Sequence, residues 1–245
     1  MRIMRIRFIG TGQMSTVRRC TSFVINDSLL FDVGSGTVEG LLENQLDVGR
    51  IKLIAISHFH GDHFGDIVYF LFRRGMQGLA NKPLVIIGPK GTQQKVIDFA
   101  NFLFGDVRDY SDIAEMWNIK FIELGDGGKI VAGEFEVEAF KVVHGDMDAN
   151  GYILRWGKKS LGYTGDACMS DGLMARLPEA KNWVVDANDI IRIENRHIGF
   201  GELIGLADMF PSLNFYAVHR KDYDTTSNML ANLVVPIDND EYLLK

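Results

Sequence analysis

Apolar and polar residues alternate over many short stretches of this chain, which is the pattern of half-buried β-strands. Residues 4–9 are the first such stretch, and Ser22–Asn26 and Leu29–Asp32 form a predicted hairpin around Asn26 and Asp27. The other predicted strands are Ile51–Ile56, Leu84–Ile87, Ile119–Glu123, Lys129–Val131, Phe135–Val142, Gly151–Trp156, Ser160–Thr164, Trp183–Val185 and Asn214–Val218.

Apolar residues return at helical spacing between several of these strands. Residues 37–46, 64–72, 96–104 and 200–209 have this spacing and are predicted to be helical. Strands that alternate with helices are typical of an α/β fold. Residues 105–118 match neither pattern, so a lid over a site and an ordinary surface excursion both stay open.

The composition is that of a globular protein, and it shows no boundary between domains. The chain has 245 residues, of which 47% are hydrophobic and 24% charged. It contains no low-complexity segment, no Pro/Ser linker and no block of like charges. We therefore expect residues 1–245 to form one domain, which is a common size for an α/β fold.

Charge and cysteine content narrow the classes of function. The net charge of −6 argues against a broad basic surface for long nucleic acids, although it leaves room for a local basic groove. The two cysteines, Cys20 and Cys168, form no disulfide framework, so we expect a reducing, cytoplasmic location. The first eight residues have a strand pattern and not that of a signal peptide, and no run is apolar enough to span a membrane.

The strongest chemical signal is a run of metal-ligand residues, Ser57-His58-Phe59-His60-Gly61-Asp62-His63. It holds three of the six histidines in the chain and directly follows the nearly all-apolar strand Ile51–Ile56. Packing does not account for so many histidines in one loop, whereas divalent metal ions take imidazole and carboxylate ligands. His58 and His60 would point the same way on an extended stretch, leaving Asp62 and His63 for a second ion.

Three further candidate ligands each follow a predicted strand. His144 follows Phe135–Val142, Asp166 follows the strand that ends at Thr164, and His219 follows Asn214–Val218. A single histidine in such a place is usually an ordinary surface residue. In an α/β sheet, however, ligands bind at the carboxyl ends of strands. Beside the His58–His63 run, these residues are therefore predicted to complete a two-metal site.

Other features that could contact phosphate are weaker. The glycine turns Gly10-Thr11-Gly12 and Gly34-Ser35-Gly36 contain neither the P-loop lysine nor the dinucleotide spacing, so we interpret them as tight turns. Four pairs of basic residues could contact phosphate, but we interpret them as solvated surface. These pairs are Arg18-Arg19, Arg73-Arg74, Lys158-Lys159 and Arg220-Lys221.

Over nearly its whole length the chain resembles the metallo-β-lactamase superfamily, and within it the RNase Z-like branch. The resemblance rests on the opening segment Phe8–Gly12, the segment Leu30–Thr37 and the signature His58–His63. It also rests on the later metal-ligand positions, which are His144, Asp166 and His219. It implies a four-layer αβ/βα sandwich, in which two mixed β-sheets are flanked by helices. It also implies a homodimer.

The resemblance further implies the roles of the metal ligands. His58, His60 and His144 would hold one ion, Asp62, His63 and His219 would hold the other, and Asp166 would bridge both. Zinc is the expected ion, with manganese or iron as alternatives. The implied activity is that of a phosphodiesterase, in which metal-activated hydroxide attacks phosphorus and Asp62 helps to orient it.

The sixth histidine, His197, lies 22 residues before His219, after the segment Val184–Ala187. By resemblance it would donate a proton to the leaving oxygen as a general acid. Asp186 would orient its ring, although the family usually has the longer Glu there. The alternative is that His197 is a surface histidine without a catalytic role.

The expected substrate depends on an arm that tRNA-processing relatives often carry and that this chain has no room for. RNase Z enzymes that process tRNA often carry a long arm between the ligand histidine that corresponds to His144 and the bridging aspartate. Only 21 residues separate His144 from Asp166 in this chain. Small or cyclic phosphodiesters are therefore the first expectation. The alternatives are tRNA 3′-processing as in RNase Z, hydrolysis of a thioester, lactone or sulfate ester, and a non-catalytic metal-binding role.

Overall fold

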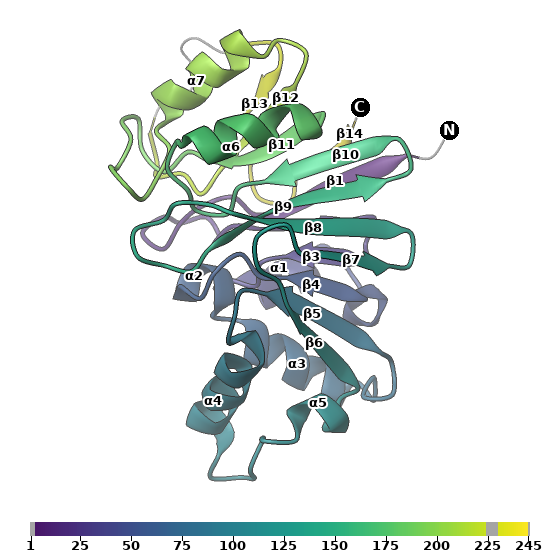
Figure 1. Ribbon diagram of the computed structural model, residues 1–245. Helices are drawn as coiled ribbons and strands as arrows, with labels where there is room; N and C mark the ends of the chain where they lie inside the picture. Colours follow the sequence, from purple (N-terminus) through teal and green to yellow (C-terminus); the bar gives the residue numbers. More distant parts are fainter. Residues whose placement is uncertain (1–2, 224–229, 245) are drawn as a thin grey trace.

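Two β-sheets face one another and carry helices on their outer sides (Figure 1). The computed structural model describes residues 3–223 and 230–244. Within them the layers follow the order helix, sheet, sheet, helix. The predicted four-layer αβ/βα sandwich of two mixed sheets is therefore confirmed.

The first sheet has the strand order β14-β1-β2-β3-β4-β5-β6. Strands β3 to β6 pair in parallel, whereas β14, β1, β2 and β3 pair antiparallel. The strands of this sheet are β1 (Met4–Gly10), β2 (Ser22–Ile25), β3 (Leu29–Phe31), β4 (Leu53–Ala55), β5 (Leu84–Gly88), β6 (Ile119–Glu123) and β14 (Glu241–Leu244).

The second sheet has the order β13-β12-β11-β10-β9-β8-β7 and is also mixed. Strands β10 to β13 pair in parallel, and β7 to β10 pair antiparallel. Its strands are β7 (Lys129–Ala132), β8 (Phe135–Lys141), β9 (Asn150–Trp156), β10 (Lys159–Tyr163), β11 (Asn182–Asp186), β12 (Asn214–Val218) and β13 (Leu233–Val234).

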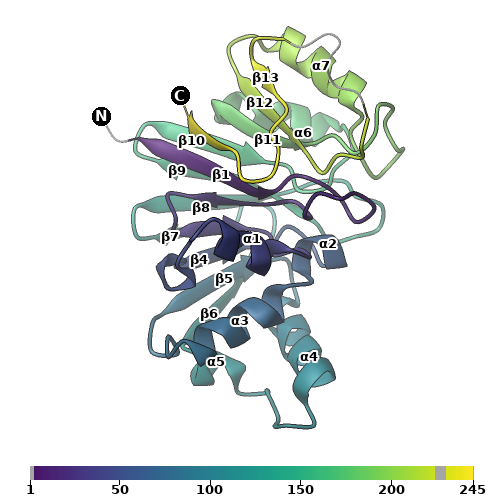
Figure 2. The same cartoon turned by 180° about the vertical axis from the view of Figure 1, so that it is seen from behind.

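Helices cover the outer face of each sheet, as the view from behind also shows (Figure 2). Helices α1, α3, α4 and α5 lie on the first sheet, and α6 and α7 lie on the second. The α-helices are α1 (Thr37–Glu43), α2 (Gly61–Phe64), α3 (Ile67–Met76), α4 (Thr92–Phe104), α5 (Ile113–Met116), α6 (Asp171–Arg176) and α7 (Phe200–Met209). Short 3₁₀ helices occupy Val48–Arg50 and Leu177–Glu179.

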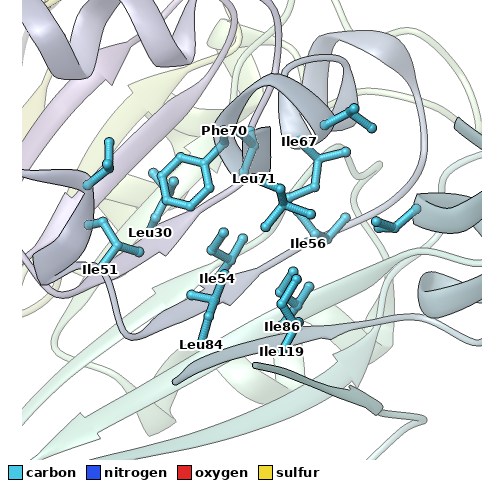
Figure 3. Packing of buried hydrophobic residues seen from close by; sticks show 14 of the residues in the cluster. Leu30, Ile51, Ile54, Ile56, Ile67, Phe70, Leu71, Leu84, Ile86 and Ile119 are labelled. Carbon is cyan, nitrogen blue, oxygen red and sulfur yellow. The ribbon is translucent and has the colours of Figure 1, made fainter. Parts of the chain in front are cut away.

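Each of the three interfaces between layers has its own apolar core. Under α3, Phe70 and Leu71 pack with Ile54 and Ile86 of the first sheet (Figure 3). A second core lies between the two sheets, and a third lies between the second sheet and its helices, where Trp183 is fully buried. Burial of apolar area on this scale is the main stabilising contribution to such a fold.

The structure differs from the predicted elements in several places. The helix predicted over 64–72 is interrupted, because the amide of Asp66 donates to Val33 and its carboxylate accepts from the amide of Val38. The sequence pattern also missed α6, β13 and β14, which are short. Ser170 caps α6 by accepting from the amide of Leu173, so a cap signal was present in the sequence.

The segment 105–118 packs against helices. It contains α5, and Tyr110, Ile113 and Trp117 are buried in the core beneath α3 and α4. This arrangement supports an ordinary surface segment and not a lid over a site. Cys20 and Cys168 are free, as expected. No helix among the described residues is both long and apolar enough to cross a membrane.

Candidate metal centre

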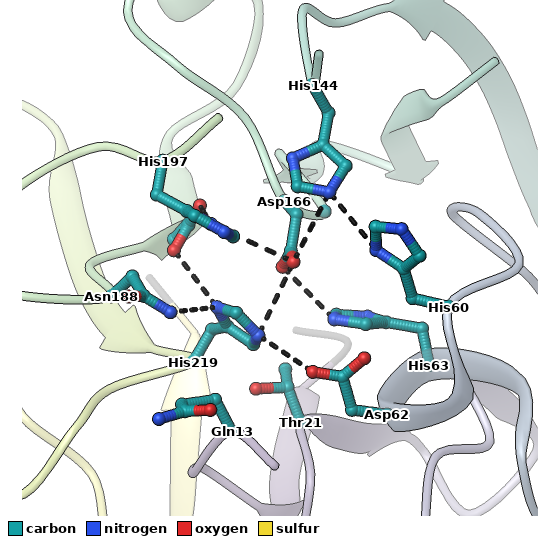
Figure 4. A network of polar contacts seen from close by, with 12 residues as sticks. Gln13, Thr21, His60, Asp62, His63, His144, Asp166, Asn188, His197 and His219 are labelled. Atoms are coloured by element: carbon teal, nitrogen blue, oxygen red, sulfur yellow. Dashed lines mark hydrogen bonds and ion pairs between the residues drawn. The ribbon is translucent and has the colours of Figure 1, made fainter. Parts of the chain in front are cut away.

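The predicted site residues gather at one edge of the sandwich (Figure 4). Parallel strands that share an edge bring the loops at their carboxyl ends together. Both sheets contribute such loops here: His58–His63 follow β4, His144 follows β8, Asp166 follows β10, Asp186 ends β11 and His219 follows β12. Residues more than 150 positions apart in the chain thus come into contact, as Asp62 and His219 do.

Three histidines and one carboxylate form the first group. Nδ1 of His60 lies 3.0 Å from Nε2 of His58 and 3.2 Å from Nε2 of His144. Oδ2 of Asp166 lies 3.9 Å from Nε2 of both His58 and His144. His58 and His60 therefore do point the same way, as the sequence predicted.

A second group shares the carboxylate of Asp166. Nε2 of His63 lies 3.1 Å from Oδ1 of Asp166, and Nε2 of His219 lies 3.4 Å from Oδ2. The same nitrogen of His219 lies 3.2 Å from Oδ2 of Asp62. The carboxylate of Asp166 thus lies within 3.9 Å of histidine nitrogens of both groups.

The donor set fits divalent cations. Among the described residues, His63 Nε2 and Asp166 Oδ1 are buried atoms without a hydrogen-bond partner, although they are close neighbours. Buried polar atoms are rarely left unpaired. Each neutral imidazole also has only one N–H, so the three converging nitrogens of His58, His60 and His144 cannot all satisfy one another. A cation in each group would satisfy these atoms.

Close backbone approaches hold the ligand loops in place. Gly165, with a φ of 59°, precedes Asp166, and a Cβ on it would lie 2.8 Å from Cβ of Ser57. A Cβ on Gly34 would lie 1.8 Å from the carbonyl oxygen of Asp62. The second glycine turn is therefore a support for the histidine loop, which agrees with the prediction that it is a tight turn.

Asp32 is a positioning residue that the sequence pattern did not identify. It is fully buried, and its carboxylate lies 2.8 Å from Nδ1 of His63. The same carboxylate accepts hydrogen bonds from the amide and hydroxyl of Ser57 and from the hydroxyl of Tyr163. Such a contact fixes the tautomer of a metal-ligating histidine, leaving Nε2 for the metal. Its location after β3, at the same edge of the sheet, was the available signal.

His197 and Asp186 are paired beside this centre. Nδ1 of His197 lies 2.8 Å from Oδ2 of Asp186 and 3.8 Å from Oδ2 of Asp166. Asp186 also accepts from the amide of Ala167, which fixes its orientation. The shorter aspartate therefore reaches the histidine, although the resembled family usually has glutamate at this position.

The crowded site shifts the pKa values of its own groups. Burial lowers the pKa of His58 well below its ordinary value. Burial would also lower the pKa of His219, but Asp166 and a hydrogen bond with Asp186 raise it to about 10. For Asp166 itself burial opposes ionisation, yet His219 and His63 hold its pKa well below the ordinary value. Bound cations would take over this charge compensation.

A cavity of about 570 Å³ opens onto the centre. Gln13 and Asn188, which the sequence pattern did not single out, line it together with His60, His197 and His219. No lysine or arginine lies among the described residues that line it.

The basic pair beside His219 has other contacts. Arg220 is buried, which contradicts the expectation of a solvated face. Its neighbour Lys221 forms an ion pair with Asp189. Arg74 is buried too, and its guanidinium donates to the carbonyls of Val48 and Lys82. These three cations are not among the described residues that line the cavity.

The sequence matches the family model described as Anti-Pycsar protein Apyc1 over residues 4–229. Among curated proteins, ribonuclease Z from Staphylococcus carnosus (strain TM300) is 32% identical over 151 residues, covering 58% of this chain and 46% of that protein. The chain thus spans about half the length of the curated relatives that it matches.

Solved structures share the fold. The metallo-β-lactamase fold protein YhfI from Bacillus subtilis has a TM-score of 0.77 and 16% identity, over 99% of this chain and 100% of that one. The short form of human tRNase Z (ELAC1) has a TM-score of 0.77 and 21% identity, over 98% and 99% of the two chains. The predicted metallo-β-lactamase fold is confirmed, and the chain belongs to the family described as Anti-Pycsar protein Apyc1.

Proposed function

We propose that this protein is a metal-dependent phosphodiesterase with a dinuclear centre. The observation that carries the proposal is the His197–Asp186 pair, in which His197 lies 3.8 Å from Asp166 and lines the same cavity. The metal ligands alone do not distinguish a phosphodiesterase, because any two-metal hydrolase needs them. A histidine held by a carboxylate beside the metal ligands can supply the proton that a departing alkoxide needs.

The ligand roles follow the two groups of the site. His58, His60 and His144 would bind one divalent ion, Asp62, His63 and His219 would bind the other, and Asp166 would bridge them. Imidazole-rich groups favour zinc, with manganese or iron as alternatives. When bound, the two ions would activate water and neutralise charge on the phosphoryl group.

The chain's own residues would handle orientation and proton transfer. With Nδ1 of His197 held by Asp186, Nε2 is left to carry the proton to the leaving oxygen. Asp62, which lies 3.2 Å from His219, would help to orient the nucleophile. The products would be a phosphomonoester and an alcohol.

Small or cyclic phosphodiesters are the proposed substrates. Between His144 and Asp166 the chain forms the antiparallel strands β9 and β10, which leaves no residues for a long arm. The cavity of about 570 Å³ suits a small molecule. Cleavage of tRNA 3′ ends is the second candidate, because the matched curated relatives are named ribonuclease Z.

A substrate screen tests the activity. The metal-loaded protein would be incubated with bis-p-nitrophenyl phosphate, cyclic nucleotides, tRNA precursors, lactones and thioesters. We expect cleavage of the small phosphodiesters. Cleavage confined to lactones and thioesters would overturn the proposal, and cleavage of tRNA precursors alone would favour the second candidate. Metal-loaded protein that cleaves none of them would support a non-catalytic role.

The variant His197→Ala tests the general acid separately from the metals. We expect a loss of about 10²- to 10⁴-fold in kcat for a phosphodiester with a poor leaving group. The metal content, measured by elemental analysis, should stay at the wild-type value. Because Asp166, Asp186, His197 and His219 could also form a ligand group, a fall in metal content would instead identify His197 as a ligand.

The homodimer, the cytoplasmic location and the single domain over residues 1–245 are part of the same proposal. They follow from the resemblance, the free cysteines and the uniform composition. Sedimentation equilibrium of the purified protein tests the dimer, and a monomer at every concentration would exclude it.

A further inference from the structure

A second cavity, of about 630 Å³, opens at the edge of the sandwich opposite the metal centre. Both sheets contribute to its walls, through the β2–β3 turn, the first residues of β4 and β5, the β7–β8 turn and the last residue of β9. Strand β4 connects the two places, because Leu53 at its start lines the cavity and His58 follows its end. Among the residues that the structure describes, none lines both this cavity and that of the metal centre.

The floor of this cavity is apolar and aromatic. Leu53 and Phe135 are buried in the core between the sheets, and Trp156 packs against that core. The rings of Phe135 and Trp156 have centroids 6.2 Å apart at an angle of 34°. The indole N–H of Trp156 donates to the carboxylate of Glu134 at 3.2 Å, which holds the ring in place. A fixed aromatic surface of this kind favours a planar aromatic ligand.

The mouth of the cavity carries two cations. Lys52 and Lys82 line it from the segments that precede β4 and β5, and both are exposed. Neither ammonium has an ion pair or hydrogen bond among the described residues, whereas the carboxylate of Glu134 accepts from the indole. The charged residues that line the cavity are two lysines and one carboxylate, Glu134, so they sum to a net charge of +1, although the whole chain has a net charge of −6. Such a local field favours an anion.

We infer that this second cavity binds a small planar aromatic anion, whose ring packs on Trp156 and Phe135 while its charged group meets Lys52 and Lys82. The volume is within the range of about 300–1,000 Å³ that is typical of small-molecule sites. This binding site is independent of the phosphodiesterase proposal, since it shares no lining residue with the metal centre.

Calorimetric titration of the full-length, metal-loaded protein with 2-naphthalenesulfonate tests the inference. This probe has a planar ring and an anionic group that the proposed activity cannot hydrolyse. We expect saturable binding at one site per chain. The neutral 2-naphthalenemethanol and the non-aromatic ethanesulfonate should each bind at least about tenfold more weakly, because each lacks one of the two interactions. Equal binding of either control compound would overturn the assignment.

Charge reversal at the mouth locates the probe. The double variant Lys52→Glu/Lys82→Glu should weaken binding by about tenfold or more, since two exposed charges are each worth up to about 1 kcal/mol. The matched control Lys90→Glu/Lys120→Glu changes two other exposed lysines that do not line this cavity, and it should bind as the wild type does. The variant Trp156→Leu should also weaken binding.

Two outcomes would contradict the inference. Unchanged affinity in both the lysine double variant and the Trp156→Leu variant would show that the probe does not use this cavity. Binding that is lost in Asp166→Asn but retained in the lysine double variant would place the probe at the metal centre.

Discussion

At the scale of single residues, the candidate centre depends on backbone conformations that most side chains avoid. Asp32 and His219 have positive φ values of 52° and 56°, and Gly165 has 59°. Asp and His tolerate this region better than branched residues do, and glycine adopts it freely. Such conformations persist where the surrounding structure holds them, and here they aim side chains at Asp166 and its neighbours.

Gly34 offers a residue-scale test of how the histidine loop is supported. A Cβ there would overlap the carbonyl of Asp62, so we expect Gly34→Ala to lower the free energy of unfolding by about 1–3 kcal/mol. Because Asp62 and His63 must shift, metal affinity should fall as well. Urea unfolding of chelator-treated protein and metal titration measure the two effects.

Gly61 supplies the matched control. It lies in the same loop, but a Cβ on it would meet no atom within 4 Å. Gly61→Ala should leave stability unchanged or raise it by up to about 1 kcal/mol, because alanine restricts the unfolded chain. Equal destabilisation by both substitutions would show that the contact between Gly34 and Asp62 is not the cause.

At the scale of elements, each ligand loop is placed by the strand before it and by bonds to a neighbouring element. The loop after β4 is bonded to β9 of the other sheet, through the amide of Asn150 to the carbonyl of Ser57 and the hydroxyl of Tyr152 to the carbonyl of Ile56. These bonds connect the two sheets at the edge where the metal ligands meet.

Glu138 on β8 joins several elements of the second sheet. It is 5% exposed, and it accepts from Arg155 of β9 at 2.8 Å and from Arg176 of α6 at 2.7 Å. Lys129 of β7 lies 3.0 Å away. Burial would raise the pKa of Glu138, but these cations lower it from 4.5 to about 2. Since the folded pKa is below the unfolded one, the stabilisation is complete above pH 4.5 and is lost as the pH falls toward 2.

The variant Glu138→Gln should therefore be less stable than the wild type by about 1–3 kcal/mol at pH 7. The difference should shrink as the pH falls from about 5 to about 2.5. Urea denaturation across this range measures it. The control Glu136→Gln changes a more exposed carboxylate on the same strand, whose contact with Arg155 is 3.3 Å, and should cost no more than about 0.5 kcal/mol. A Glu138 effect that does not change with pH would contradict the assigned cause.

At the scale of the whole molecule, the candidate ligands come from both halves of the sandwich. His58, His60, Asp62 and His63 follow a strand of the first sheet, and His144, Asp166 and His219 follow strands of the second. Bound ions would thus cross-link the two sheets and stabilise the folded state over the unfolded chain.

Metal removal should lower the melting temperature. A ligand present at 100 to 1,000 times its dissociation constant stabilises by about 3–4 kcal/mol, which corresponds to about 5–15 °C for a chain of this size. Differential scanning calorimetry with and without a chelator measures the shift. The Asp166→Asn variant, which lacks the carboxylate that we propose as the bridge between the two ions, should respond much less. An equal shift in this variant would mean that the chelated metal is bound elsewhere.

The sequence by itself determined the class of fold and indicated a metal site. The run of three histidines and one aspartate after an apolar strand predicted a metal site, because few other causes place so many ligand types together. The strand and helix periods predicted an α/β fold, and the family resemblance implied its four layers. Short elements such as β13, β14 and α6 were missed, because a few residues carry too little periodic signal.

Only the tertiary structure decided how these parts combine. Asp32, Gln13 and Asn188 belong to the site because separate segments meet at one edge, and the sequence marks only Asp32, by its place directly after β3. The pairing of His197 with Asp186, and the second cavity at the opposite edge, likewise depend on contacts between distant segments. The physical reason is that the local sequence governs which faces of each strand and helix are buried. The packing of the two sheets against each other then determines which side chains come into contact.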